Sequence, residues 1–308
     1  MTDQNEPIKT RAGFVAVMGK PNVGKSTLIN ALLGQKVAAV SPRPQTTRKR
    51  QMGILTLPAT AERPETQAVF VDTPGVHKPR HKLGELMNQE AARTLEDSDA
   101  ILLVVDASQP PDEEDGLLFE LLGRLKRRRP VVLALNKKDL LDDEAFAAHQ
   151  QAFLEGVPNA EPAPISARNG EGLEGLLARL TDHLQTRELF FPEDQVTDLY
   201  EREIAADLIR EAALLLLRDE VPHGIAVRID QFTERGEEGA YIEATIFVER
   251  DSHKGIVIGQ GGQMLKKIGS VARQQIEQMS ARKIFLQLKV KVRKNWRDDE
   301  KTLRSFGY

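Results

Sequence analysis

The sequence predicts an α/β protein with a doubly wound, mostly parallel sheet, followed by a smaller α+β domain. Three observations lead to this prediction. Short, almost wholly apolar runs alternate with longer mixed segments in the first half of the chain, strict polar and apolar alternation replaces them in the second half, and the net charge changes sign. Runs that are apolar on both faces are typical of buried parallel strands, whereas alternation is typical of strands with one exposed face.

The first domain is predicted at 11–186, after a flexible N-terminus at 1–10 and before a linker at 187–197. Its buried strands are expected at 14–18, 68–71, 101–105 and 131–135. Helical segments are expected between or after them, at 82–96, 115–127 and 173–185. This alternation of strand and helix predicts a parallel sheet with helices on both faces.

The second domain is predicted at 198–308. Helices are expected at 199–218 and 263–279, and strands at 225–230, 241–248 and 283–293. The last strand alternates along its whole length, so one face is apolar and the other carries Lys289, Lys291 and Arg293. We expect the apolar face to join the core and the basic face to remain at the surface.

The bulk composition excludes several classes of protein. The chain has 308 residues and no Cys, which excludes disulfides and thiolate metal sites. No apolar stretch approaches the roughly 18 residues that a membrane-spanning helix needs, and the N-terminus lacks the pattern of a secretory signal. We therefore expect a protein of the reducing cytoplasm.

The charge is distributed unevenly along the chain. From Asp251 onward there are 13 Lys and Arg against 5 Asp and Glu, a net charge of +8, although the whole chain carries −3. Clustered cations displace counterions from nucleic-acid phosphates, so this region predicts a nucleic-acid surface. A solvated basic tail is the alternative.

The loop after the first predicted strand has the composition of a phosphate-binding loop. It reads Gly19, Lys20, Pro21, Asn22, Val23, Gly24, Lys25, Ser26 and Thr27. Small residues allow successive N–H groups to converge on phosphate oxygens at a helix N-terminus. Lys25 is expected to reach the β- and γ-phosphates, and the Ser26 hydroxyl to bind Mg²⁺. The alternative is an ordinary glycine-rich turn.

Two further motifs follow buried strands. The first reads Asp72, Thr73, Pro74 and Gly75; the second reads Asn136, Lys137, Lys138 and Asp139. Asp72 is expected to help hold Mg²⁺ at the crevice beyond the strand ends, and Gly75 to contact the γ-phosphate. A carboxylate at Asp139 accepts two hydrogen bonds from guanine that adenine cannot donate. The site is therefore predicted to bind GTP or GDP, and an ATPase is disfavoured.

Two weaker signals complete the predicted nucleotide site. Ser166 and Ala167 follow a short apolar pair and are expected to support the base through backbone N–H groups. A loop at 41–51, rich in Pro and Arg, carries Thr46 and Thr47. Thr47 is the preferred candidate to complete the Mg²⁺ shell when the γ-phosphate is present. An ordinary basic surface loop is the alternative.

The order of these motifs resembles the translation-factor-related class of P-loop GTPases, and the second half narrows the resemblance. A glycine cluster at 256–262, followed by a helix, resembles the Gly-x-x-Gly loop of a type II KH domain. This combination of domains is similar to the Era family of bacterial ribosome-assembly GTPases. Three further segments resemble that family: Gln45 to Arg48, Phe191 to Asp194 and the final residues from Leu303.

The resemblance implies a GTP hydrolase that controls binding to the 3′ end of small-subunit ribosomal RNA during assembly of that subunit. It also implies Mg²⁺ with GTP or GDP, a monomer, no DNA partner, and peripheral contact with the inner membrane. The expected RNA-binding residues surround the glycine cluster or lie on the basic strand face. They are Lys254, Ile256, Ile258, Gly259, Gln260, Gly261, Gly262, Lys266, Lys267, Lys289, Lys291 and Arg293. An RNA chaperone in which hydrolysis is incidental is the alternative.

The sequence does not supply the residue that orients the attacking water in many small GTPases. That position holds Val76, which has no hydrogen-bonding group. Lys25, Asn22 and Thr47 are the expected catalytic residues, and intrinsic turnover is expected to be slow. We hypothesise that the Asn22 amide oxygen helps to hold a K⁺ ion near the β- and γ-phosphates, where other GTPases present an arginine.

This hypothesis predicts faster GTP turnover in KCl than in NaCl at equal ionic strength, because a bound K⁺ adds positive charge where the transition state needs it. Steady-state phosphate release measures the difference. Equal rates in the two salts would exclude the K⁺ site.

Overall fold

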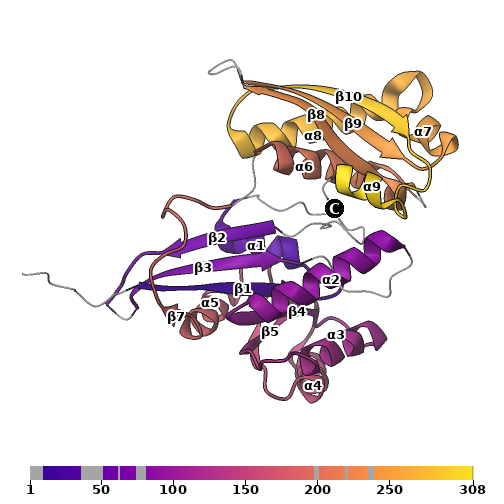
Figure 1. Ribbon diagram of the computed structural model, residues 1–308. Coiled ribbons are helices and arrows are strands. Elements are labelled where there is room, and N and C mark those ends of the chain that lie inside the picture. The colour runs from indigo at the N-terminus through magenta and orange to yellow at the C-terminus, as the bar shows by residue number, and fades with distance from the viewer. Residues whose placement is uncertain are drawn as a thin grey trace, which may run out of the picture. The chain divides into compact units, whose positions relative to one another are not determined.

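The computed structural model describes residues 10–35, 51–61, 63–73, 81–197, 201–218, 221–234, 239–306 and 308. The chain forms two compact units, each with its own sheet (Figure 1). Most of the first unit lies before residue 198 and most of the second lies after it, with residues 78–88 counted in the second unit. The predicted limits of the domains and the linker stay predictions.

The first unit contains a seven-stranded, mostly parallel sheet in the order β2-β3-β1-β4-β5-β6, with β7 paired to β1. The strands are β1 (Thr10–Met18), β2 (Gln51–Leu57), β3 (Glu65–Asp72), β4 (Ala100–Asp106), β5 (Val131–Asn136), β6 (Glu161–Pro164) and β7 (Gln185–Thr186). Strands β2 and β7 pair antiparallel with their neighbours, and the other pairs are parallel. The predicted doubly wound α/β domain is thus confirmed.

The helices of the first unit connect these strands. They are α1 (Lys25–Leu33), α2 (Lys82–Asp97), α3 (Glu113–Gly123), the short η1 (Lys138–Leu140), α4 (Asp143–Gly156) and α5 (Leu173–Asp182). The part of α2 up to Asn88 is counted in the second unit. The core is built from strand residues such as Val15 and Leu102, both fully buried, because parallel strands are covered on both faces. The four predicted apolar runs lie inside β1, β3, β4 and β5.

The carboxyl ends of the central strands place their last polar side chains at one edge of the sheet. Strand β3 ends at Asp72, β4 at Asp106 and β5 at Asn136. Parallel pairing fixes this alignment, since Val17 lies opposite Asp72 and Asp106 lies opposite Asn136. In open α/β sheets ligands bind at this edge, which therefore locates the candidate site.

The segment at 187–197, predicted as a linker, makes regular contacts with the first unit. Buried Gln67 accepts hydrogen bonds from the N–H groups of Phe190 and Phe191, at 2.9 and 3.0 Å, and donates one to the Phe191 carbonyl at 2.9 Å. The Ile54 N–H donates to the carbonyl of Val196 at 2.9 Å. These bonds hold the segment beside β2 and β3.

The second unit is an α+β domain with a three-stranded sheet in the order β10-β9-β8 (Figure 1). Its main elements are α6 (Glu201–Leu216), η2 (Pro222–Gly224), β8 (Ala226–Glu234), β9 (Ala240–Val248), α7 (Asp251–Ile258), η4 (Gln260–Gly262), α8 (Gln263–Ser280), β10 (Ile284–Val292) and α9 (Glu300–Ser305). Apolar residues of α6 and α8 pack on one face of the sheet. The predicted second, smaller α+β domain is confirmed as a unit with its own sheet.

The opposite face of this sheet is covered at one end by the C-terminal segment. Trp296, fully buried, donates from its indole N–H to the Gly224 carbonyl at 2.9 Å and packs against Phe306. Helix α9 of this segment was not predicted from the sequence. Within the described part of the chain, no helix has both the length and the apolar character needed to cross a membrane.

Candidate functional site

The predicted phosphate loop lies between β1 and α1, at the carboxyl edge of the sheet. Gly24 caps α1 in a left-handed conformation, with φ of 103°, and a β-carbon there would lie 2.3 Å from the Asn136 side-chain nitrogen. Only glycine meets both conditions. The loop therefore turns tightly into the N-terminus of α1, where backbone N–H groups attract anions.

Lys25 is the buried cation of this loop. Its Nζ donates to the carbonyls of Gly19 and Lys20, at 2.9 and 2.8 Å. Burial lowers the pKa of Lys25 to about 8, although the Asp72 carboxylate opposes this shift. Burial makes the charged form of Lys25 unfavourable, and a bound anion would stabilise that charged form. The site is therefore electrostatically suited to phosphate.

Ser26 and Asp72 bring two oxygen ligands together at the edge of the sheet. The Ser26 hydroxyl donates to Asp72 at 3.4 Å, and Asp72 is buried at the end of β3. Hydroxyl and carboxylate oxygens are the donors that Mg²⁺ prefers, and Mg²⁺ commonly takes its remaining ligands from substrate phosphates and water. These two residues thus fit the predicted Mg²⁺ site.

Several predicted residues lie outside the described residues. They are Thr47 and its alternative Thr46, together with Pro74, Gly75 and Val76. Thr73 is described and buried. Its N–H and hydroxyl both donate to the Val17 carbonyl, at 3.2 and 2.7 Å, which fixes the chain just after Asp72.

Buried Asn136 joins three loops of the candidate site. Its side-chain nitrogen donates to the Val23 carbonyl at 2.8 Å, and its side-chain oxygen accepts from the Ala167 N–H at 2.9 Å. The phosphate loop, the end of β5 and the loop that carries Ser166 are thereby held in one arrangement. The structure brings these predicted residues together.

Asp139 lies beyond this junction in η1 and is exposed. Within the described chain its carboxylate takes part in no hydrogen bond or ion pair, so both oxygens can accept from a ligand. The neighbouring Lys138 N–H donates to the Ile165 carbonyl at 3.1 Å, which connects η1 to the loop of Ser166 and Ala167. This arrangement leaves an exposed carboxylate acceptor beside the loop of Ser166 and Ala167, as the predicted guanine site would need.

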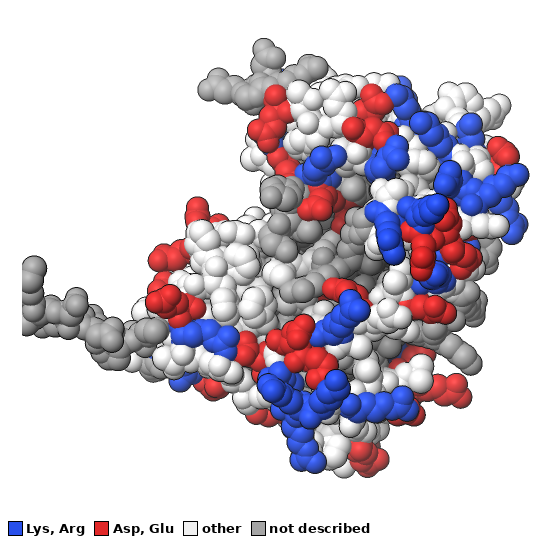
Figure 2. Space-filling model, viewed as in Figure 1, with Lys and Arg blue, Asp and Glu red and all other residues white. Residues whose placement is uncertain are grey.

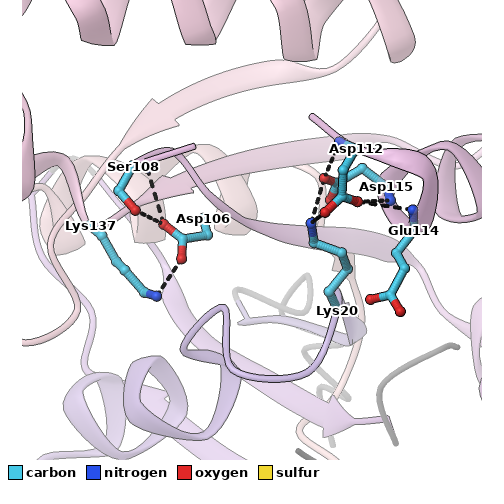
Figure 3. A network of polar contacts seen from close by, with 7 residues as sticks. All are labelled: Lys20, Asp106, Ser108, Asp112, Glu114, Asp115 and Lys137. Atoms are coloured by element: carbon cyan, nitrogen blue, oxygen red, sulfur yellow. Dashed lines mark hydrogen bonds and ion pairs between the residues drawn. The ribbon is translucent and has the colours of Figure 1, made fainter. Parts of the chain in front are cut away.

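Asp106 is a site residue that the sequence analysis missed (Figure 3). It forms an ion pair with Lys137, and its carboxylate also accepts from the Ser108 N–H at 3.0 Å. Burial opposes ionisation of Asp106, but hydrogen bonds from Lys137 and Ser108 outweigh it and lower its pKa. Its position directly after an apolar run, at the end of β4, was the available signal, as at Asp72 and Asn136.

The second candidate site is the glycine loop between α7 and α8. Gly259 has φ of 71°, and a β-carbon there would lie 2.9 Å from the backbone nitrogen of Met264. The Gly262 N–H donates to the Gly259 carbonyl at 3.1 Å, which closes the turn. Gln260 and Gly261 are exposed at its tip, where a sugar-phosphate strand can approach the backbone closely.

A groove of about 610 Å³ continues from this loop between α8 and β10. It contains only two of the predicted RNA-binding residues, Gly262 and Lys266. Other lining residues were missed by the sequence analysis: Leu265, Gly269, Ser270 and Arg273 on α8, Tyr241 on β9, and Ile284, Phe285, Leu286, Gln287 and Leu288 on β10. The spacing of four along Leu265, Gly269 and Arg273 was a usable signal, since such residues share one helix face.

The remaining predicted RNA-binding residues fall into two groups. Lys254, Ile256, Ile258 and Lys267 lie on α7 and α8 beside the glycine loop, and Ile256 is exposed. Lys289, Lys291 and Arg293 lie on the sheet face opposite the helices. There Lys289 pairs with Glu243, and Arg293 pairs with Asp299 at 3.5 Å.

Acidic partners thus reduce the positive charge of the basic strand. In the view of Figure 2, Lys and Arg over the second unit are interspersed with Asp and Glu. No ion pair is formed by Lys254, Lys266 or Lys267 within the described residues, so the cations beside the glycine loop are better placed to bind phosphates.

The comparisons with known proteins agree with the two units of the fold. A family model described as a 50S ribosome-binding GTPase matches residues 14–137, and a KH domain model matches residues 220–297. GTPase Era of Heliobacterium modesticaldum is 44% identical over 300 residues, which cover 97% of this chain and 98% of the relative. The chain belongs to the Era family.

Other members of the Era family extend the match. GTPase Era of Pseudomonas putida is 44% identical over 310 residues, covering 100% of this chain and 99% of the relative. A crystal structure of Era with MgGDPNP and nucleotides 1506–1542 of 16S ribosomal RNA has a TM-score of 0.90 and 38% identity, covering 97% and 99% of the two chains. A single-residue variant of Aquifex aeolicus Era bound to GDP.AlF4⁻ has a TM-score of 0.89 and 37% identity over the same shares.

The low pKa of Lys25 predicts that nucleotide binding takes up protons in this member of the Era family. Above pH 8 the free protein holds Lys25 mostly neutral, whereas phosphate raises its pKa and favours the charged form. Affinity for GDP should therefore fall as pH rises above 8, by at most about tenfold per pH unit.

Calorimetry at pH 8.5, in buffers with different ionisation enthalpies, measures this uptake directly. We expect a substantial fraction of one proton to be bound per GDP. At pH 6.5 Lys25 is already charged, so its contribution to proton uptake should vanish there. An uptake near zero at pH 8.5 would contradict the assignment of Lys25.

Proposed function

We propose that this chain is a GTP hydrolase whose bound nucleotide controls its binding to the 3′ end of small-subunit ribosomal RNA during assembly of that subunit. The arrangement around Asn136 carries the nucleotide part, because one amide holds the phosphate loop and the guanine-binding loops together. The glycine loop and groove beside α8 carry the RNA part.

The solved relatives support both halves of the proposal. One Era structure contains MgGDPNP together with nucleotides 1506–1542 of 16S ribosomal RNA, and another contains GDP.AlF4⁻. In GDP.AlF4⁻ the product nucleotide GDP is bound together with a mimic of the transferred phosphoryl group. This ligand supports hydrolysis as part of the function. An RNA chaperone with incidental hydrolysis is less well supported.

Hydrolysis transfers the γ-phosphoryl group of GTP to water. The attacking water forms a bond to the γ-phosphorus, the bond to the β-phosphate oxygen breaks, and GDP and phosphate leave. The loop N–H groups and Lys25 bind and orient the phosphates and stabilise their negative charge. Ser26 and Asp72 would hold Mg²⁺, which neutralises charge on the β- and γ-phosphates when bound.

Guanine selectivity is assigned to Asp139 and to the loop supported by Asn136. The Asp139 carboxylate would accept from the guanine N1–H and 2-amino groups, while the backbone of Ser166 and Ala167 borders the base. The Lys137 and Asp106 ion pair holds the lysine chain at the same edge of the sheet. Adenine offers no such pair of donors, and its binding would leave Asp139 unsatisfied.

RNA binding is assigned to the glycine loop, the uncompensated lysines beside it and the groove along α8. Close backbone approach at Gly261 and Gly262 suits a sugar-phosphate strand, and the apolar groove residues suit unstacked bases. Action as a monomer in the cytoplasm, with peripheral contact at the inner membrane, remains part of the proposal. Binding to DNA is not expected.

The variant Gly261→Asp tests the RNA half against the GTP half. A β-carbon at this position meets nothing within 4 Å, and Asp tolerates the φ of 58°, so the fold should survive. The added carboxylate would repel RNA phosphates. We expect affinity for a 3′-end small-subunit RNA fragment to fall by about tenfold or more at 100 mM salt, with GTP turnover within about twofold of the unchanged chain.

Gly123→Asp is the matched control, because the same charge is added in the first unit where there is also open space. It should bind RNA as the unchanged chain does. Filter binding and phosphate release measure the two activities. Unaltered RNA affinity in Gly261→Asp would exclude the glycine loop as the binding site, and absence of GTP turnover in the unchanged chain would exclude the hydrolase.

A further inference from the structure

The two halves of the phosphate loop are held from different sides. Asn136 on β5 holds the second half through the Val23 carbonyl. The first half is held by the side chain of Lys20, which extends to the N-terminus of α3 (Figure 3).

Lys20 Nζ lies 2.7 Å from a carboxylate oxygen of Asp112 and 2.7 Å from one of Asp115. The Lys20 side chain is 15% exposed and the Asp115 side chain 1% exposed. An ion pair that is shielded from water is screened far less by salt than one at the surface, and its geometry is correspondingly restricted. The contact thus fixes the position of Lys20 relative to α3.

Asp112 and Asp115 are themselves held rigidly by the helix. Asp112 caps α3 by accepting from the N–H groups of Glu114 and Asp115, at 2.9 and 3.2 Å. Asp115 accepts from the Asp112 N–H at 3.0 Å, which completes a reciprocal capping box. Lys20 therefore binds two carboxylates whose positions are already determined by backbone hydrogen bonds.

The pairing stabilises the charge on Lys20, whereas burial outweighs the pairing at Asp115 and raises the pKa of that carboxyl. Burial opposes the charge on Lys20, but its hydrogen bonds to Asp112 and Asp115 outweigh this effect and raise the pKa of Lys20. The lysine therefore remains charged across the physiological range. One ammonium group is shared by two carboxylates, so the cluster has no excess positive charge to offer to a phosphate.

The loop between the two attachments contains a residue in the left-handed backbone conformation. Asn22 has φ of 66°, a region that Asn and Asp tolerate better than other residues with a side chain but that is kept only where the surrounding structure fixes it. A free loop would relax from this conformation, and phosphate binding would then have to restore it. Holding both ends of the loop reduces that cost.

We propose that Asp112 and Asp115 act through Lys20 as positioning residues that keep the phosphate loop in its nucleotide-binding shape. This inference rests on the proposed function, since it names a determinant of affinity at the same site. It assigns Lys20 to loop geometry, whereas the alternative is direct contact between Lys20 and the nucleotide phosphates.

The two possibilities predict opposite effects of removing the carboxylates. If Lys20 positions the loop, Asp115→Asn should weaken binding of GDP and of a non-hydrolysable GTP analogue by about tenfold, in proportion for both ligands. If Lys20 contacts phosphate, the same substitution releases the lysine and removes a negative charge, so nucleotide binding should strengthen. Stopped-flow binding of fluorescent nucleotides measures both affinities.

A set of variants separates positioning from stability. Lys20→Met should match Asp115→Asn, the double variant should be no weaker than the worse single variant, and Lys20→Arg should retain most of the affinity. Asp112→Ser keeps a capping oxygen but removes one charge, so a smaller loss is expected. At saturating GTP, kcat should stay within about twofold, because the loss is in binding. Where Lys20→Met leaves Asp115 unpaired and fails to fold, the double variant serves in its place.

Glu114→Gln is the control, because this carboxylate lies in the same turn of α3 but is not joined to Lys20, whose ion pairs are to Asp112 and Asp115 (Figure 3). It should leave nucleotide affinity unchanged. Melting temperatures, with binding measured well below them, identify loss of folded protein. Unchanged or tighter nucleotide binding in Asp115→Asn would overturn the inference while the unchanged chain still binds GDP. Failure of the unchanged chain to bind GDP would instead overturn the proposed function.

Discussion

One buried amide determines the geometry of the nucleotide site. Asn136 donates to the phosphate loop and accepts from the loop of Ala167, so both loops are fixed to the end of β5. A buried amide without these partners would cost about 1 to 3 kcal/mol for each unsatisfied group, which makes the arrangement strongly preferred. Because a β-carbon at Gly24 would collide with the same amide, the loop sequence and the position of Asn136 constrain each other.

The parallel sheet explains why this amide lies where it is needed. Strands that are buried on both faces are apolar along most of their length, so a polar side chain that must be available to a ligand lies where the strand ends. Asp72, Asp106 and Asn136 all occupy such positions, at one edge of the sheet. Because the core excludes charged side chains, the carboxylates of Asp72 and Asp106 lie at this edge, and Lys25 and Lys137 supply positive charge beside them.

The candidate RNA-binding site of the second unit is built differently from the nucleotide site. Its glycine loop exposes backbone rather than side-chain groups, and the adjoining groove is lined by apolar residues of α8 and β10. Aromatic residues make up only 5% of the chain, but Tyr241 and Phe285 line this groove, so stacking of unpaired bases adds to backbone and apolar contact. The lysines beside the loop supply attraction that does not depend on the RNA sequence.

Much of this organisation could be predicted from the sequence, for physical reasons. Long apolar runs identify β1, β3, β4 and β5, and spaced glycines identify both loops. Strand β2 was missed because its edge position makes its pattern mixed, and β6 because its four residues include Pro162 and Pro164. Helix α9 was missed because it is short and depends on packing against Trp296.

The functional residues that were missed depend on contacts between distant parts of the chain. Lys20 lies 92 and 95 residues from Asp112 and Asp115, and Asp106 lies 31 residues from Lys137, so no local spacing indicates either pair. The groove residues of α8 and β10 likewise become a surface only when the two elements pack together. Lys289 was predicted to bind RNA, but it forms an ion pair with Glu243 on the neighbouring strand. The sequence alone does not show that these two residues lie side by side.

The central claim is that the nucleotide controls RNA binding. Its most direct test is the affinity of the full chain for a 3′-end small-subunit RNA fragment, measured with a saturating non-hydrolysable GTP analogue and with saturating GDP, at one stated salt concentration. We predict tighter RNA binding with the analogue, by about fivefold or more, as expected for coupling between two sites. Equal affinity in the two nucleotide states would contradict the account.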